Sequence, residues 1–444
     1  MGVSRDLHIA IIGAGMGGLA TALALAKEGF THIDVYETAS DLGFVGAGIQ
    51  LAPNMARILD RLGVWVPIAK DATPLKGASI RKGPTDEELA FSDMLWIAES
   101  YNYKHMVGHR ASLAGGLYEG CKKESAIKFH FASPVIEFKS FTPNPTFIVS
   151  PRKGHGEPYT ASCDVVLGAD GVKSRTRVAM LQELGVDAKV VDSGQAAYRI
   201  MLPRKDMEKD PELLALIDAD QSTRWIGERK HIIAYPVASK TIYNISTAHP
   251  DSNFAQAPDE TYTTLGSKES MLSVYSDFAP VVRKMLAMVP EGDVCEWKLR
   301  VHEPLPTWVL GTAALVGDAC HPTLPHLNQG AAQAIEDAAV IAVALSKAPD
   351  LGPESIHKAL KVYERLRKER AEALVAMAAA NGKEMQLGDG AAAAERDAAF
   401  KAFRESGQGK VPDKAADKGV LSFIYGWDAS EETEKQFDSI YKSL

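Results

Sequence analysis

The 444-residue sequence has little cysteine, no long apolar run and no excess of positive charge. Its four cysteines are Cys121, Cys163, Cys295 and Cys320, and none belongs to a CxxC pair. This spacing argues against a disulfide framework or a metal site, so we expect reduced thiols, no bound metal and a cytoplasmic location. The longest apolar runs fall short of the ~18 residues that a membrane span requires, and the first residues do not resemble a signal peptide. A net charge of −8 argues against nucleic acid as a partner.

The first motif is a glycine-rich turn between a strand and a helix. His8 to Ile12 predicts a strand, and Gly13-Ala14-Gly15-Met16-Gly17-Gly18 follows it directly. A helix is expected from Leu19 to Lys27, and a second strand from Ile33 to Tyr36 ends at Glu37. This is GxGxxG in the context that a dinucleotide site requires, with an acidic residue about 20 positions on.

Each residue of this motif has a different expected role in binding the ligand. Gly13 makes the tight turn, Gly15 lets a pyrophosphate approach the backbone, and Gly18 lets the helix lie close to the strand. Glu37 would accept hydrogen bonds from an adenosine ribose. The motif predicts a ligand that contains ADP, without choosing between FAD and NAD.

Two later segments have the composition of a polar-ligand site. A buried strand leads into Asp170-Gly171, and another leads into Gly317-Asp318. After the second, Gly330 and Ala331 open a helix whose free N–H groups can donate to an anion. Arg177 was expected to pair with Asp170 or with a phosphate.

Two shorter segments are weaker candidates for ligand contact. Gly46 to Asn54 contains glycines that allow backbone to approach a flat ligand, with Asn54 as the expected N-cap of a helix from Met55 to Leu62. Arg110 stands where a helix begins, which suits a phosphate contact or a solvated arginine equally well.

From Ala196 to Arg300 the pattern changes to short antiparallel strands, with helices expected over Pro211 to Ile217 and Met271 to Met288. His231 and Tyr235 are four apart on one strand, so both side chains point to the same face. They are either ligand-binding residues or packed core residues. His357 to about Met385 predicts a long amphipathic helix, Gly388 to Ala394 a linker, and the helical C-terminus a scaffold or an oligomer contact.

The ordered triple of GxGxxG, Asp170-Gly171 and Gly317-Asp318 resembles class A flavoprotein aromatic hydroxylases, which are single-component FAD-dependent monooxygenases. The segments around them are most similar to the salicylate-hydroxylase-like and hydroxybenzoate hydroxylase branch of fungal type. The resemblance implies an α/β fold, with a Rossmann-like FAD-binding domain of the p-hydroxybenzoate-hydroxylase type, an inserted mixed-sheet substrate domain and C-terminal helices. The expected division is 1–77, 102–188 and 301–347 for FAD, 78–101 and 189–300 for substrate, and 348–444 for the helical region.

The resemblance also implies which residues hold the cofactor. Gly13, Gly15, Gly18 and Glu37 would bind the ADP half of FAD, and Arg110 its middle. The backbone at Gly48 would lie near the flavin, and Asp170 would contact both FAD and NAD(P)H. Asp318 would hold the ribityl chain, while Gly330 and Ala331 would direct N–H groups at the pyrimidine end of the ring.

For the reaction, the resemblance implies that NADH or NADPH reduces FAD and that O2 forms a flavin C4a-hydroperoxide, which hydroxylates a phenolic acid such as a hydroxybenzoate. His231 and Tyr235 would bind and deprotonate the phenol, and Arg199 is a further expected active-site residue. His326 could assist the phenol or cap its loop. CO2 would leave if oxygen enters at the carboxylate-bearing carbon. The alternatives are a larger phenolic substrate and a flavin-binding protein without turnover. A monomer or a homodimer is expected.

Overall fold

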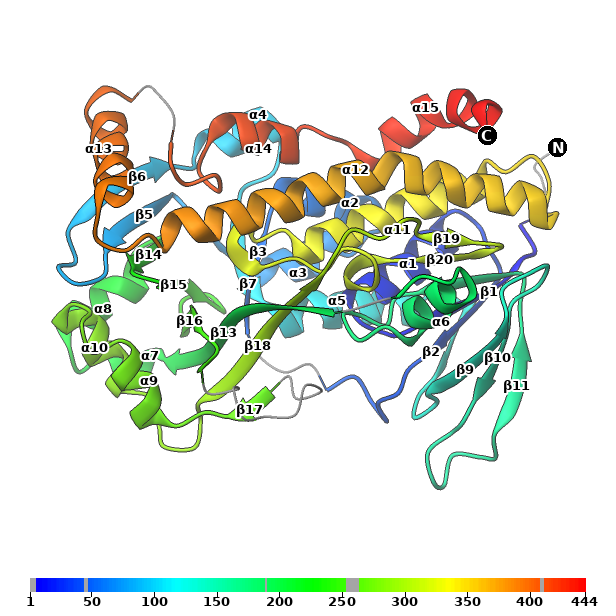
Figure 1. Cartoon of the computed structure of the whole chain (residues 1–444), viewed down its shortest axis with the longest axis horizontal. Helices are drawn as coiled ribbons and strands as arrows, with labels where there is room; N and C mark the ends of the chain where they lie inside the picture. The colour runs from blue at the N-terminus through cyan, green and yellow to red at the C-terminus, as the bar shows by residue number, and fades with distance from the viewer. Residues whose placement is uncertain (1–4, 44–46, 188–189, 253–262, 408–410) are drawn as a thin grey trace.

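The computed structural model describes residues 5–43, 47–187, 190–252, 263–407 and 411–444. Two large β-sheets organise these residues, and the long helix α12 (Pro353–Met385) extends over both parts of the molecule (Figure 1). The expected fold class, an α/β flavin-binding domain with a mixed-sheet part and C-terminal helices, is confirmed.

The first sheet brings the three sequence motifs to one edge. Its order is β19 (Val309–Leu310), β20 (Ala313–Leu315), β12 (Val165–Gly168), β1 (His8–Ile12), β2 (His32–Tyr36) and β8 (Ile127–His130). All neighbours are parallel except β19 and β20. Strands β1, β12 and β20 are adjacent and parallel, so the segments that follow them meet at the same edge.

Helices α1 (Met16–Lys27), α5 (Arg110–Lys122) and α11 (Gly330–Ser346) pack with this sheet. Helix α11 is alanine-rich and buried almost throughout, as expected for a helix with apolar residues on all sides. It lies close to α1 where the two helices cross. A Cβ on Gly17 would be only 3.2 Å from the Cβ of Ala334. This crossing holds the first turns of both helices beside the motif edge.

The second sheet has eight strands. Their order is β17 (Thr263–Leu265), β18 (Cys295–His302), β13 (Val190–Pro203), β16 (Ile242–Pro250), β15 (Lys230–Val237), β14 (Gln221–Gly227), β5 (Gly77–Lys82) and β6 (Glu88–Asp93). All neighbours are antiparallel except β14 and β5. The expected domain division stays a prediction, although the strands of the two sheets fall within its two sets of residues to within two positions.

Short helices cover one face of the eight-stranded sheet. They are α7 (Arg204–Met207), α8 (Pro211–Asp218), α9 (Lys268–Val274) and α10 (Pro280–Ala287), and they enclose a core that includes Trp225 and Tyr243. The single helix expected over Met271 to Met288 is wrong, because Pro280 has no N–H to continue a helix and instead begins α10. The opposite face of the sheet is free to line a cavity.

Smaller elements connect the two sheets. Strands β3 (Gly48–Leu51), β7 (Met106–His109) and β4 (Thr73–Pro74) form one three-stranded sheet, and β9 (Val135–Ser140), β10 (Thr146–Val149) and β11 (Tyr159–Ser162) form another. The remaining helices of this region are α2 (Pro53–Arg61), α3 (Trp65–Lys70), α4 (Trp96–Tyr101) and α6 (Arg175–Glu183).

The C-terminal helices lie against both parts of the molecule (Figure 1). After α12 come α13 (Ala391–Ser406), α14 (Lys418–Tyr425) and α15 (Ala429–Ser443). The linker expected over Gly388 to Ala394 is too long, since α13 already begins at Ala391. Within the described residues, no helix is both long enough and apolar enough to cross a lipid bilayer.

Candidate active site

A cavity of about 330 Å³ lies where the motif edge of the first sheet faces the open face of the second. Its walls come from segments as distant as the start of α1 and the start of α11 on one side and β13 to β16 on the other. The predicted site residues that line it are Gly15, Gly48, Arg110, Arg199, His231, Tyr235, Asp318, Gly330 and Ala331. The fold therefore brings nine of the thirteen predicted residues to one space, and the other four support its walls.

The three motif glycines are required for different reasons. Gly13 has a φ of +102°, and a Cβ there would lie 2.6 Å from the carbonyl oxygen of Ala169. A Cβ on Gly18 would lie 2.0 Å from the Gly13 carbonyl oxygen, so any larger residue would push the helix off the strand. Nothing lies within 4 Å of the corresponding position on Gly15, which leaves the open backbone that a pyrophosphate needs.

Glu37 holds the glycine turn in shape. Its carboxylate accepts hydrogen bonds from the amides of Ala14 and Ala39, each at 2.8 Å. A carboxylate that is fixed beside the first turn of α1 retains lone pairs for the hydroxyls of a ribose. The geometry is compatible with the ADP-binding part that the sequence predicts for this residue.

Asp170 lies behind the cavity wall, whose surface is formed by its neighbours Ala169 and Gly171. Its carboxylate accepts hydrogen bonds from the hydroxyls of Ser174 and Thr176 and from the amide of Thr176. The expected pairing of Arg177 with Asp170 is wrong, because the buried guanidinium donates to main-chain carbonyls, including that of Ala319. Arg177 thereby ties the Asp170 turn to the turn that carries Asp318.

Asp318 and the start of α11 form a further part of the cavity wall. Asp318 lies in the 3-10 helix η2 (Gly317–Ala319) and its side chain is exposed to the cavity. No side chain caps α11, so the amides of its first turn, at Gly330 and Ala331, are available to a ligand. The carboxylate can accept hydrogen bonds from the hydroxyls of a polyol chain, and the amides can donate to a ring that carries negative charge.

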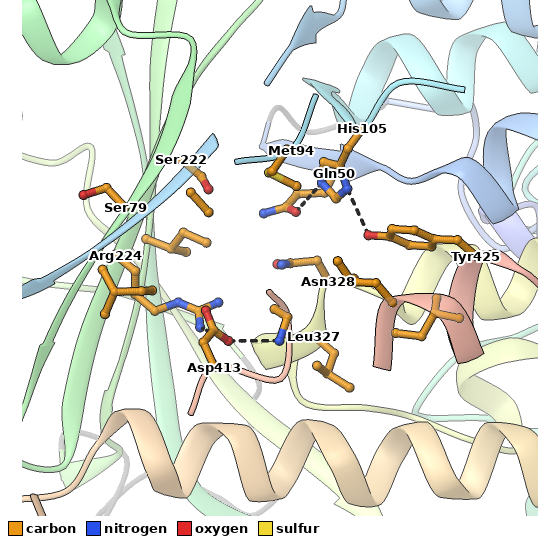
Figure 2. A pocket seen from close by; sticks show the side chains of 16 residues that line it. Gln50, Ser79, Met94, His105, Ser222, Arg224, Leu327, Asn328, Asp413 and Tyr425 are labelled. Carbon is orange, nitrogen blue, oxygen red and sulfur yellow. Dashed lines mark hydrogen bonds and ion pairs between the residues drawn. The ribbon is translucent and has the colours of Figure 1, made fainter. Parts of the chain in front are cut away.

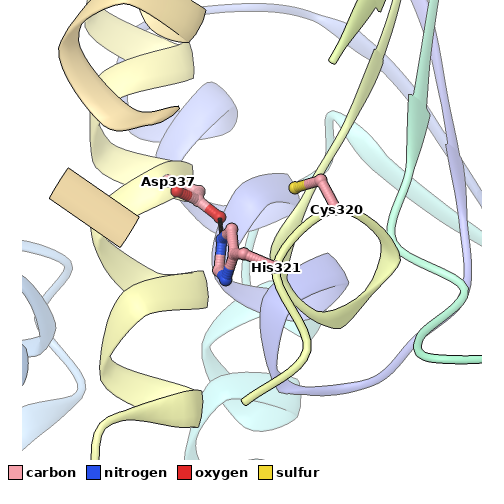
Figure 3. Close-up of side chains that lie close together, drawn as sticks. All are labelled: Cys320, His321 and Asp337. Atoms are coloured by element: carbon pink, nitrogen blue, oxygen red, sulfur yellow. Dashed lines mark hydrogen bonds and ion pairs between the residues drawn. The ribbon is translucent and has the colours of Figure 1, made fainter. Parts of the chain in front are cut away.

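A buried group behind Asp318 fixes the position of that turn (Figure 3). Asp337 accepts from the amide of Gly317 at 2.9 Å and pairs with His321 Nε2 at 2.6 Å and Arg367 Nε at 2.8 Å. Burial alone would disfavour the charge on Asp337, but His321 and Arg367 hold its pKa at about 2. Cys320 lies nearby, and burial raises the pKa of its thiol. With three donors on one carboxylate, the cluster acts as a hydrogen-bond network.

A second buried network anchors α11 from the other side. Glu336 pairs with Arg367 at 2.6 Å and with Arg370 at 2.9 Å, and accepts from Asn54 at 2.7 Å. The N-cap predicted at Asn54 is wrong, since α2 begins at Pro53, whose fixed φ suits the first helical position. Asn54 instead connects α2 to the helix that carries the flavin-side amides.

The predicted catalytic residues share one face of the eight-stranded sheet. His231 and Tyr235 project from β15 and Arg199 from β13, and all three line the cavity. Asn244, paired with Tyr235 across the strands, accepts from the amide of Gly48 at 2.6 Å. A Cβ on Gly48 would clash with Tyr235 and Asn244 at 2.7 and 2.4 Å, which explains a glycine here. Gly46 lies outside the described residues.

Arg199 is a cation at this wall that remains available to bind a ligand. Its guanidinium lies 5.1 Å from the ring centre of Trp297, and among the described residues it has no carboxylate partner. Burial lowers its pKa, and the charge of Arg110 lowers it further. Asp318 offsets part of this positive charge, but among the described residues neither guanidinium pairs directly with a carboxylate, so the two groups favour the binding of anions in this part of the cavity.

A relay of side chains determines the hydrogen-bonding state of His231. His326 Nε2 lies 3.2 Å from Gln195 Oε1, Gln195 Nε2 donates to Gln386 Oε1 at 3.2 Å, and Gln386 Nε2 lies 3.1 Å from His231 Nδ1. The amide donors all point the same way, so His231 accepts at Nδ1 and carries its proton on Nε2. Burial lowers the pKa of His231 well below its usual value. It therefore presents a neutral N–H to the cavity.

This state differs from the near-neutral base that the sequence suggested for His231. His326, which could assist the phenol or cap its loop, lies behind His231 with their ring centres 5.1 Å apart. Burial lowers the pKa of His326 to about 3. We therefore assign His326 to the relay and to packing.

Sequence reasoning missed several residues at this site. Gln386 lies between the predicted long helix and the predicted linker, where no function was expected, yet it bonds to His231. Arg224 also lines the cavity and is only 4% exposed. The sequence signal for Arg224 is its charge within the apolar strand around Trp225. Arg224 pairs with Ile233 across the strands, so both side chains point to the same face.

Comparison with known proteins agrees with this geometry. A family model described as "FAD binding domain" matches residues 6–378. The FAD-dependent monooxygenase atnJ of Arthrinium sp is 31% identical over 429 residues, covering 97% of this chain and 96% of the relative. The 3-hydroxybenzoate 6-hydroxylase 1 of Aquipseudomonas alcaligenes is 33% identical over 365 residues, covering 81% and 84%.

Among solved structures, a salicylate hydroxylase substrate complex superposes with a TM-score of 0.78 at 23% identity, covering 97% of this chain and 98% of that one. This likeness shows the fold. The family match, the two relatives and the motif geometry together show the chemistry class. The chain belongs to the FAD-dependent monooxygenases that hydroxylate aromatic compounds, with FAD as cofactor and NAD(P)H and O2 as co-substrates.

Proposed function

We propose that the enzyme hydroxylates a phenolic acid such as a hydroxybenzoate, and that CO2 leaves when oxygen enters at the carboxylate-bearing carbon. The observation that carries this proposal is the placement of Arg199, His231 and Tyr235 on one sheet face, opposite the flavin-side residues of the cavity. A relative named for 3-hydroxybenzoate also supports a substrate with a hydroxyl and a carboxylate on one ring.

Arg199 is the proposed partner of the substrate carboxylate. The guanidinium, which has no direct carboxylate partner among the described residues, can form two parallel hydrogen bonds with a carboxylate, the strongest pairing open to it. Binding an anion there would also relieve the repulsion between Arg199 and Arg110, which lowers the pKa of Arg199. A neutral phenol of the same size would lack both contributions.

His231 and Tyr235 are the proposed partners of the phenol oxygen. Burial raises the pKa of Tyr235 and lowers that of His231, so both present hydrogen-bond donors at neutral pH. Donors stabilise a phenolate more than a phenol, and this lowers the pKa of the bound substrate. The residues thus favour the electron-rich phenolate without needing to take up its proton themselves.

The residues present fit FAD. Open backbone at Gly15, the carboxylate of Asp318 and the uncapped start of α11 all line the cavity. When bound, FAD would accept electrons from NADH or NADPH and then activate O2. The apolar and hydrogen-bonded walls of the protein exclude water, which prevents loss of the reactive oxygen before it reaches the ring.

A panel of hydroxybenzoates tests the proposal. We expect at least one member to accelerate NADH or NADPH oxidation about tenfold or more, with one hydroxylated product formed per substrate and CO2 scored in the same reaction. Failure of every phenolic acid to stimulate oxidation by the yellow, FAD-containing protein would refute the proposal. That outcome would instead favour a flavin-binding protein without turnover.

We further propose a cytoplasmic monomer or homodimer. Support comes from the four free cysteines, three of them buried, which a reducing compartment preserves. Light scattering on the purified protein would measure its mass, and any assembly larger than a dimer would contradict this part of the proposal.

A further inference from the structure

A smaller cavity of about 30 Å³ lies beyond the main one, away from the flavin-side residues. The two cavities share four lining residues, which are Gln50, Arg224, Ile233 and Asn328. Its outer wall is formed by Asp413, Leu421 and Tyr425, which lie beyond residue 378, where the family match ends. We call this smaller cavity the inner pocket.

Three buried nitrogen atoms at the inner pocket form no hydrogen bond with the described residues. They are Nε2 of Gln50 and Nε and Nη1 of Arg224, on residues that are 6% and 4% exposed, and of the three only Nη1 has an ion-pair partner, Asp413. Figure 2 shows the polar ends of Gln50, Asn328 and Arg224 directed at the same space. An unpartnered buried donor is destabilising, so an acceptor in this position would be stabilising.

The orientation of Gln50 is fixed by its other neighbours. Its Oε1 lies 2.8 Å from His105 Nε2, and His105 Nδ1 lies 3.0 Å from the hydroxyl of Tyr425. Burial lowers the pKa of His105 to about 4, so the ring is neutral and has one donor, which Gln50 Oε1 accepts. Tyr425 of the C-terminal segment is thus linked through His105 to Gln50, whose Nε2 has no hydrogen-bond partner among the described residues.

The charge at the inner pocket is already balanced. Arg224 Nη1 lies 3.1 Å from Asp413 Oδ1, and both side chains are about 95% buried or more. Asp413 is held in place by Asn381 at 2.9 Å and by the amide of Ala415 at 3.0 Å. Asp413 would repel a second carboxylate bound in this pocket, and this repulsion would offset the attraction of Arg224. The pocket thus favours a neutral acceptor over an anion.

Distance separates this pocket from the proposed carboxylate partner. Arg199 and Arg224 stand in one row across the sheet, through the paired positions Ser246 and Ile233. Three strand spacings of about 4.8 Å place their Cα atoms roughly 14 Å apart. A single hydroxybenzoate at Arg199 leaves the inner pocket to another part of the ligand.

We infer that the inner pocket is a substrate subsite that holds a neutral hydrogen-bond acceptor, such as a carbonyl oxygen, on a substituent of the phenolic ring. The inference rests on the proposed function and extends it, because it selects a substituted phenolic compound over a plain hydroxybenzoate. The C-terminal segment completes the subsite through Asp413 and Tyr425, which makes this segment a determinant of specificity.

Binding to the FAD-loaded enzyme tests the inference, with the flavin absorbance change as the readout. The probes are a hydroxybenzoate, the same ring with an added acyl group, and the same ring with an added carboxylate. We expect the acyl compound to bind at least tenfold more tightly than the parent, and the dicarboxylate no more tightly. The Gln50→Leu and Arg224→Met variants should each reduce the acyl-to-parent preference at least fivefold, whereas Asp413→Asn should shift it toward the dicarboxylate.

The exposed Gln182→Leu substitution on α6 is the matched control, and its acyl-to-parent ratio should equal that of the native enzyme. FAD content and melting temperature identify variants that fail to fold, in which case Gln50→Glu, which replaces the donor by an acceptor, supplies the comparison. An unchanged ratio in folded Gln50 and Arg224 variants, or a crystal complex with ordered water only in the inner pocket, would overturn the inference. If instead no phenolic compound is hydroxylated, the proposed function itself fails.

Discussion

Replacing Gln386 by glutamate should convert His231 from a hydrogen-bond donor into a group that titrates near neutral pH. The native amide donates to His231 Nδ1 at 3.1 Å, which places the ring proton on Nε2. A carboxylate at that position would accept from Nδ1–H and attract the imidazolium. At about 4 Å and an effective dielectric constant of 20, this attraction is about 4 kcal/mol, equivalent to roughly three pKa units.

The assay is the pH dependence of phenol binding, together with histidine ring ¹⁵N spectra of the FAD-loaded enzyme. In the native enzyme, burial keeps the pKa of His231 well below its usual value, so we expect no His231 titration between about pH 5.5 and 8. The Gln386→Glu variant should gain a titrating ring in this range. Gln386→Met is the matched control, because it removes the donor without adding charge.

The ¹⁵N spectrum of the native enzyme tests whether the relay sets the protonation of the His231 ring. A His231 ring that is protonated on Nδ1, or that titrates near pH 6.5 in the native enzyme, would refute the relay and restore the base suggested by the sequence. Loss of the same titration in His231→Asn would identify the ring responsible.

Three further predictions concern ionisable groups, namely Asp318 in the cavity and the buried Asp337, His105 and His326. Asp318→Ala should weaken FAD binding about 10- to 100-fold, because a charge-assisted hydrogen bond contributes about 1.5–3 kcal/mol; unchanged fluorescence titrations of FAD would contradict this. Asp337→Asn should lower the free energy of unfolding by about 3–5 kcal/mol, since it leaves buried charges unpaired, and an unchanged melting temperature would argue against the network. Stability should be full above the unfolded-state histidine pKa of about 6.5 and fall as pH drops toward the folded values of about 4 for His105 and about 3 for His326. Urea titrations should show a shallower acid loss in His326→Asn, and equal slopes would contradict the assignment.

The parts of the site that were predictable depend on local backbone chemistry. Gly13 needs a positive φ and Gly18 a close helix contact, and both requirements leave a fixed spacing in the sequence. The four-residue separation of His231 and Tyr235 likewise defines one face of a strand. Such features depend on residues near one another in the chain, so one sequence is enough to recognise them.

The parts that were missed depend on contacts between distant segments. Gln386 stands 155 positions from His231, and nothing in its local sequence distinguishes it from a solvated helix end. Asn54 has the composition of an N-cap, but Glu336 and Gln329 provide buried partners that a cap position would forfeit. The helix break at Pro280 was local and could have been predicted from the proline alone.

The sequence by itself determined that the ligand contains ADP and in which order the elements that bind it occur, because short-range glycine and carboxylate spacings specify a phosphate-binding turn. Only the tertiary structure decided how His231 is protonated and what closes the substrate cavity. Those properties arise where β15, the end of α12 and the segment around Asp413 meet, and burial there lowers the pKa of His231.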